Sequence, residues 1–67
     1  MGYSILFSYY KVIGEEERLI DEYLLPYTDT KEGLKSILMK QNYQFIDHDL
    51  WGVHIHNFMS IAEIVEA

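Results

Sequence analysis

Three histidines in the C-terminal third of the chain carry the side chains best suited to metal binding: His48, His54 and His56. Histidines two residues apart in a strand project to one face, so His54 and His56 could hold a divalent cation, with His48, Asp47 or Asp49 completing the set. A structural zinc site normally includes cysteine, and this chain has none. A polar, outward strand face explains the same histidines without a metal. We favour that interpretation and predict no cofactor.

Carboxylates form a second group, because residues 13 to 29 contain six of them against Arg18 alone. Such a concentrated negative field could imitate a phosphate backbone and occupy the basic groove of a nucleic-acid-binding protein. The plainer interpretation is that these side chains are solvated, keep a small protein soluble and help to start a helix. The acidic residues that we select as candidates for partner binding are Glu15, Glu16, Glu17, Asp21 and Glu22.

Aromatic residues form a third group, which consists of Tyr3, Phe7, Tyr9, Tyr10, Tyr43, Phe45 and Trp51. Aromatic rings on a sheet can stack nucleic-acid bases, but such platforms are flanked by Lys and Arg. The net charge of −6 opposes direct binding of nucleic acids or of anionic membranes. Most of these rings are therefore expected in the core, and Tyr10, Tyr27 or Trp51 is expected to remain exposed as an interface anchor.

Catalysis finds little support in the sequence. The four serines occur outside any nucleophile-elbow context, and the paired carboxylates lie in charged runs rather than in an apolar pocket that could raise a pKa. A domain this small also rarely encloses a pocket of about 300 Å³. We therefore expect a protein that is not an enzyme.

Length and composition predict one folded domain over residues 1–67. Its hydrophobic content of 49% is far from the profile of a disordered chain. A chain this short buries only about 60% of its unfolded surface, so the stability is expected to be a few kcal/mol at most. The lack of cysteine favours a reducing compartment, and the N-terminus resembles neither a signal peptide nor a membrane span. The expected location is cytoplasmic.

The first half of the chain predicts a strand followed by two helices. Residues 2–12 alternate in the manner of a pleated strand, with Tyr3, Ile5, Phe7 and Tyr9 on the face expected to meet the core. Gly14 ends this strand, and the three glutamates that follow favour a helix N-terminus. The helix would run within residues 13–25, where Pro26 ends it. A second helix is predicted over about residues 30–41, capped by Asp29 or Thr30.

The second half predicts a hairpin and an ambiguous tail. Residues 43–45 and 51–55 alternate with a period of two, on either side of a polar turn over residues 47–49. Residues 58–66 fit a short helix with a capping box at Ser60, which we slightly prefer, or a fourth strand over residues 61–65.

The predicted fold is a small α+β domain with the order β-α-α-β-β. Its two helices would pack on one face of a three-stranded antiparallel sheet, or a four-stranded one if the tail is a strand. We expect an interaction module that binds a larger, basic protein and inhibits or adapts it, a style common among phage and mobile-element proteins. The alternatives are a histidine-based metal or ligand-binding module, and a homodimer formed through the first strand if that strand lies at a sheet edge.

Overall fold

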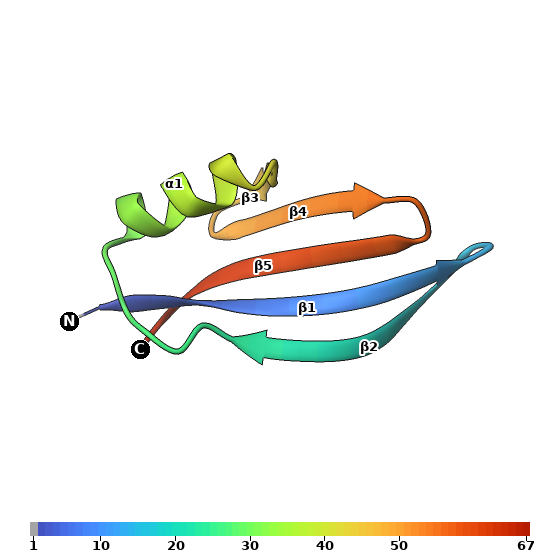
Figure 1. The fold of residues 1–67 in the computed structure, drawn as a ribbon, viewed down its shortest axis with the longest axis horizontal. Helices are drawn as coiled ribbons and strands as arrows, with labels where there is room; N and C mark the ends of the chain where they lie inside the picture. Colours follow the sequence, from blue (N-terminus) through green and yellow to red (C-terminus); the bar gives the residue numbers. More distant parts are fainter. Residues whose placement is uncertain (1) are drawn as a thin grey trace.

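The computed structural model describes residues 2–67 and consists of one antiparallel sheet with a single helix (Figure 1). The sheet order is β2-β1-β5-β4-β3. The elements are β1 (Tyr3–Ile13), β2 (Glu16–Leu24), α1 (Lys31–Lys40), β3 (Gln44–Asp47), β4 (Leu50–Ile55) and β5 (Phe58–Glu66). The predicted β-α-α-β-β order with two helices on a smaller sheet is therefore wrong.

The segment predicted as the first helix is instead β2, the long edge strand that pairs with β1. Gly14 has a φ of 62° and occupies the first central position of a two-residue turn between Ile13 and Glu16. A glycine with positive φ at this position suits the tight turns that match strand twist. The chain therefore reverses directly after Gly14, and the glutamates enter a strand.

An irregularity in β2 explains why its sequence resembles a helix. The β1–β2 register shifts so that Tyr9 pairs with Asp21 while Tyr10 pairs with Leu19, which leaves Ile20 as an extra residue. A bulge of this kind moves the alternation by one residue. The apolar side chains on either side of it consequently fall at a spacing close to that of a helical face.

The strand predicted over residues 2–12 is confirmed as β1, and its predicted core face is correct: Ile5 and Phe7 are buried. The homodimer alternative required this strand to lie at a sheet edge, and that condition is not met, because β1 pairs with β2 on one side and with β5 on the other. The edges of the sheet are β2 and β3.

The tail forms β5 rather than the preferred short helix, and it occupies the centre of the sheet. It pairs with β1 from Tyr3↔Glu66 to Lys11↔Phe58 and with β4 on its other side. Its burial alternates, with Ser60, Ala62 and Ile64 buried. Tertiary pairing with two neighbours therefore outweighs the local capping-box signal.

The helix predicted over residues 30–41 is confirmed as α1. Thr30 is its N-cap, with the side-chain oxygen accepting a hydrogen bond from the Gly33 N–H at 3.1 Å. Leu34 and Leu38, one turn apart, are fully buried. The predicted hairpin is also confirmed, as β3 and β4 joined by a turn at His48 and Asp49.

The core lies between α1 and one face of the sheet, at the end of the molecule where the chain termini lie (Figure 1). We call this the covered face. The molecule is 40 Å long, whereas a ten-residue helix spans about 15 Å. Helix α1 therefore covers only part of this face. The buried apolar residues are Ile5, Phe7, Leu34, Leu38, Trp51, Ala62 and Ile64.

We call the opposite face of the sheet the bare face. Within residues 2–67, no helix covers it. Residues that pair across neighbouring strands share a face, so Leu6, Glu63 and Leu50 form one row on it. Leu50 is 36% exposed and Leu24, on β2, is 56% exposed. The fold is thus a single sheet with one partly covered and one open face. Neither α1 nor any other described segment forms a helix long and apolar enough to cross a membrane.

Candidate functional site

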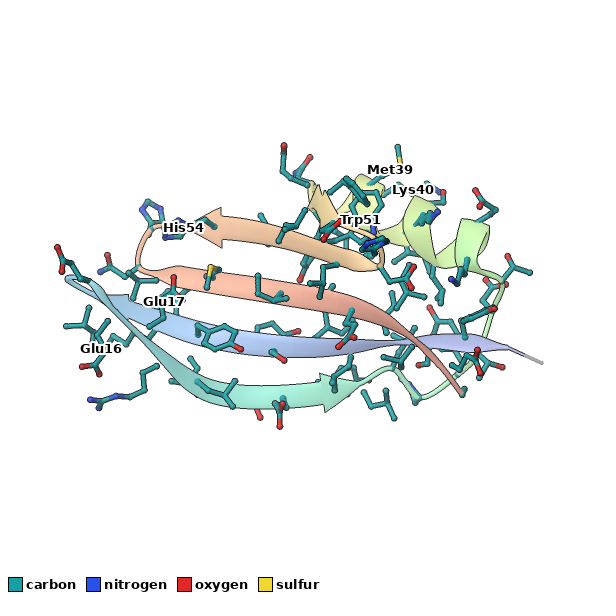
Figure 2. The ribbon with its side chains drawn as sticks, turned by 180° about the vertical axis from the view of Figure 1, so that it is seen from behind. Glu16, Glu17, Met39, Lys40, Trp51 and His54 are labelled. Atoms are coloured by element: carbon teal, nitrogen blue, oxygen red, sulfur yellow. The ribbon has the colours of Figure 1, made fainter. Side chains whose placement is uncertain are left out.

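The acidic residues of β2 are divided between the two faces of the sheet. Their pairing partners on β1 place Glu16 and Asp21 on the covered face and Glu17 and Glu22 on the bare face, while Glu15 lies in the hairpin turn. In Figure 2 the labelled Glu16 and Glu17 lie at the end of the sheet formed by the long hairpin. The predicted set therefore does not form one acidic helix face.

Two of these carboxylates have local partners. Arg18 Nη2 lies 2.9 Å from Glu16 Oε1 in an exposed ion pair on the covered face. Asp21 Oδ1 accepts a hydrogen bond from the backbone N–H of Glu22 at 2.9 Å. Glu17 and Glu22 thus remain as the two carboxylates of β2 that contribute charge to the bare face.

The bare face combines apolar rows with carboxylates. Glu63 of β5 lies on it between Leu6 and Leu50, and Glu22 pairs with Ser8. Gly52 leaves a shallow groove of about 400 Å³, into which Ile46 and Ile61 project. The apolar residues of this face are Leu6, Tyr10, Val12, Leu19, Leu24, Ile46, Leu50, Met59, Ile61 and Val65.

All five Lys and Arg residues belong to the other side of the molecule. Lys11 and Arg18 pair with each other on the covered face, and the remaining three lysines belong to α1, which packs there. Lys31 Nζ lies 5.0 Å from the Tyr3 ring centre and 3.5 Å from an oxygen of Asp49. The bare face of residues 2–67 therefore carries Glu17, Glu22 and Glu63, and Asp47 at its β3 edge, with no Lys or Arg beside them.

A hollow of about 720 Å³ lies on the part of the covered face beyond the end of α1. Phe7, 6% exposed, is surrounded by three tyrosines: its ring centre lies 6.3 Å from Tyr9, 6.3 Å from Tyr23 and 6.0 Å from Tyr43. The aliphatic wall comes from β4 and the β2 bulge. The residues that line the hollow are Tyr9, Ile20, Asp21, Tyr23, Gln41, Tyr43, Val53, Ile55, Phe58 and Ser60, together with Tyr10 and Met59, which the strand register assigns to the bare face.

Polar groups of this hollow converge around Tyr9. Burial raises the pKa of the Tyr9 hydroxyl above its ordinary value of 10.0, and the neighbouring Tyr43, Asp21 and Tyr23 raise this pKa further. Tyr9 is therefore neutral at physiological pH. The Tyr43 hydroxyl lies 2.7 Å from Ser60 Oγ, a hydrogen bond that joins the end of α1 to the central strand β5. Asp21 is the one charged side chain in the lining of the hollow.

The histidines do not meet. His48 and His56 occupy turns at opposite ends of β4, with φ values of 44° and 55°, a conformation in which histidine is enriched. A six-residue strand spans about 20 Å, which separates these two side chains. His54 lies on the bare face opposite Met59, and Figure 2 shows it near the hairpin end. Nowhere in residues 2–67 do three or more His, Asp or Glu side chains gather in a way that could hold a metal ion.

The three proposed aromatic anchors differ in exposure. Tyr27, in the connection before α1, is 50% exposed and Tyr10 is partly exposed on the bare face. Trp51 is 7% exposed, with its ring packed edge-on against Phe45 at 5.5 Å. Its indole nitrogen is buried without a hydrogen-bond partner. Trp51 belongs to the core, so the accessible anchors of the predicted set are Tyr10 and Tyr27.

Several residues of the two surfaces escaped sequence reasoning. Glu63 was assigned to a helix cap, and its place beside Leu6 follows only from the strand register of the tail. Tyr23 and Asp21 belong to the segment predicted as a helix over residues 13–25, and both line the hollow because this segment is the strand β2. The alternation of β5 was the one signal that could have placed Glu63, had the strand alternative been preferred.

Comparison of the chain with protein-family models, with curated proteins and with solved structures gave no match. The structure itself defines the class of protein: a small domain built on a single antiparallel sheet. Its functional interpretation depends on the chemistry of these surfaces alone.

Proposed function

We propose that this protein is a protein-interaction module that binds a larger, basic protein and inhibits or adapts it, and that the bare face is the binding surface. The observation that supports the proposal is the chemistry of that face. It presents apolar side chains together with Glu17, Glu22 and Glu63, while the Lys and Arg residues belong to the other side. A cytoplasmic location forms part of the proposal and is supported by the lack of cysteine.

Exposed apolar surface provides the affinity in this proposal. Leu19, Leu24 and Ile46 are each about half exposed, at 48%, 56% and 53%. Burial of apolar surface contributes about 25 cal/mol per Å² before the costs of association. The three carboxylates provide specificity, because charge complementarity steers a cationic partner and repels an anionic one.

The same charges oppose self-association through this face. Two copies packed face to face would bring six carboxylates together, from Glu17, Glu22 and Glu63 of each chain. Like charges across an interface are unfavourable, whereas lysine and arginine side chains of a different protein would neutralise them. A basic partner is therefore favoured over a second copy.

The proposal is tested with labelled amphipathic peptides in fluorescence anisotropy titrations. One peptide places leucines at the i, i+3, i+4 and i+7 spacing among lysines to form a basic amphipathic helix, and the other has glutamate in place of every lysine. The leucine–lysine peptide should bind the protein, and the binding should weaken as salt rises. The leucine–glutamate peptide should bind at least about tenfold more weakly.

Two matched triple variants locate the surface. Neutralising Glu17→Gln, Glu22→Gln and Glu63→Gln should reduce affinity for the basic peptide by about fivefold or more. The control neutralises three carboxylates of the covered side, Glu16→Gln, Asp21→Asn and Glu32→Gln, and should bind nearly as the unmodified protein does. Equal losses in the two variants, or equal binding of the two peptides, would overturn the assignment of the bare face.

The apolar contribution is tested separately. Leu24→Ser removes an exposed apolar side chain from the bare face, and Met39→Ser removes one of similar exposure, 62%, from the helix. Leu24→Ser should weaken binding while Met39→Ser should not. The same pair of variants then serves in capture experiments that search for the natural partner, where a protein retained by Met39→Ser and lost with Leu24→Ser is the one that uses this face.

A further inference from the structure

The structure contains a hollow on the opposite side of the sheet from the proposed partner face. This surface is the hollow beyond the end of α1, defined by the three tyrosines around Phe7. Its volume of about 720 Å³ falls within the range of about 300–1,000 Å³ that is typical of small-molecule sites. The hollow is independent of Glu22 and Glu63, which lie on the bare face.

We propose that this hollow binds a small organic cation, an ammonium group carried on an apolar body. Aromatic rings attract cations through the negative charge of their faces, and groups of such rings are a recurrent solution for binding ammonium ligands. Here Tyr9, Tyr23 and Tyr43 provide the rings. Val53 and Ile55 of β4 provide apolar surface for the body of the ligand.

The charges of the hollow support a cation over an anion. Asp21 is the one charged residue in its lining, and its carboxylate belongs to the strand that also carries Tyr23. Arg18, the nearest cation along β2, is held by Glu16 at 2.9 Å. Lys11 lies on the same face, nearer the hairpin, and is not part of the lining. A carboxylate ligand would therefore meet Asp21 without a cation of the lining to receive it.

Hydrogen-bonding groups at the base of the hollow favour an ammonium that carries protons. The Tyr43 hydroxyl and Ser60 Oγ are 2.7 Å apart, and one of the two atoms is the donor. The Tyr9 phenol is protonated at neutral pH, and burial raises its pKa above the ordinary value of 10.0. These oxygen atoms, together with the Asp21 carboxylate, can accept hydrogen bonds from an ammonium group.

The test uses phenethylamine, protonated at neutral pH, and 2-phenylethanol, which has the same apolar body without the charge. Each compound is titrated into the ¹⁵N-labelled protein and followed by nuclear magnetic resonance. Phenethylamine should shift the backbone signals of Tyr9, Asp21 and Ser60 and should bind at least about threefold more tightly than the alcohol. Equal affinity of the two compounds, or binding of neither, would overturn the proposal.

Two neighbouring residues provide a matched pair of variants. Asp21→Asn removes the carboxylate of the hollow, and Glu22→Gln removes the next carboxylate along the same strand, which points to the bare face. Asp21→Asn should lower the affinity for phenethylamine by about two- to fivefold, and Glu22→Gln should leave it unchanged. Tyr23→Leu, which removes one ring at a half-exposed position, should lower it by a similar factor. Signal shifts confined to the bare face, or equal effects of Asp21→Asn and Glu22→Gln, would contradict the assignment.

Discussion

Asp21 and Glu22 are neighbours on β2 that point to opposite faces of the sheet, and Asp21 Oδ1 accepts a hydrogen bond of 2.9 Å from the Glu22 backbone N–H. The Leu25 N–H donates to the Ile5 carbonyl of β1. Alternate residues of a strand direct their N–H groups to the same side, so the Glu22 N–H points to the free edge. The Asp21 carboxylate thus accepts a hydrogen bond from the Glu22 N–H, which an added strand would otherwise use for pairing. The bulge at Ile20 interrupts the same free edge of β2.

Removing this protection should promote self-association through the edge of β2. Asp21→Ala frees the Glu22 N–H and removes one negative charge, whereas Asp21→Asn removes the charge but keeps a side-chain oxygen that can accept the bond. Sedimentation velocity at increasing protein concentration should therefore show more dimer or aggregate for Asp21→Ala than for Asp21→Asn. The same behaviour in both variants would show that charge alone protects the edge.

The docking of α1 should decide whether the chain folds. Leu34 and Leu38 are fully buried, and truncation of a buried leucine to alanine costs about 2–5 kcal/mol. This is comparable with the whole stability expected for a domain of this size. Urea unfolding followed by the fluorescence of the buried Trp51 should show Leu38→Ala largely unfolded in water. Met39→Ala, at a position 62% exposed, should remain within about 0.5 kcal/mol of the unmodified protein.

The Tyr43–Ser60 hydrogen bond should couple the end of α1 to the sheet. Tyr43→Phe and Ser60→Ala should each lower the free energy of unfolding by about 0.5–1.5 kcal/mol. Each change removes one of the two hydroxyls, so the remaining partly buried hydroxyl loses its hydrogen-bond partner. The double variant should lose less than the sum of the two single changes. Ser36→Ala, at an exposed helix position, is the control and should change little. Strict additivity would show that the 2.7 Å contact carries no coupling.

Alkaline pH should weaken the fold through Tyr9. Its pKa is raised in the folded state, mainly by burial, so the folded protein holds the phenolic proton more tightly than the unfolded chain does. The associated stability is fully present below the ordinary pKa of 10.0 and is lost as pH rises through the folded value. Ultraviolet titration should show a late phenolate signal that is absent in Tyr9→Phe. Loss of stability above pH 10 should also be smaller in Tyr9→Phe.

Elements with a clear local signal were predictable from the sequence. The alternation of β1, the Thr30 cap of α1 and the polar turn at His48 each follow from side-chain chemistry within a few residues. Strand β2 was not predictable in this way. The bulge at Ile20 shifts the alternation, and pairing with β1 outweighs the favourable position of three glutamates at a helix start.

The candidate surfaces depended on information that is less local still. Glu63 joins Glu22 on one face only because β5 lies between β1 and β4. The hollow brings together Tyr9 of β1, Tyr23 of β2 and Tyr43 of the connection between α1 and β3, and its existence depends on where α1 ends. The net charge pointed to a basic partner, but the distribution of that charge between two faces required the sheet order.

The central pairing of β1 with β5 also governs how the molecule must assemble. Tyr3 meets Glu66 and Ile5 meets Ile64, so the middle of the sheet joins the two most distant strands of the chain. Contacts between residues so far apart in sequence slow folding, because the intervening segments must lose their freedom before these contacts form. On the ribosome, β1 and β2 emerge long before β5 does. The apolar rows of the early hairpin therefore stay uncovered until β5 pairs with β1, and exposed apolar surface of this kind favours aggregation.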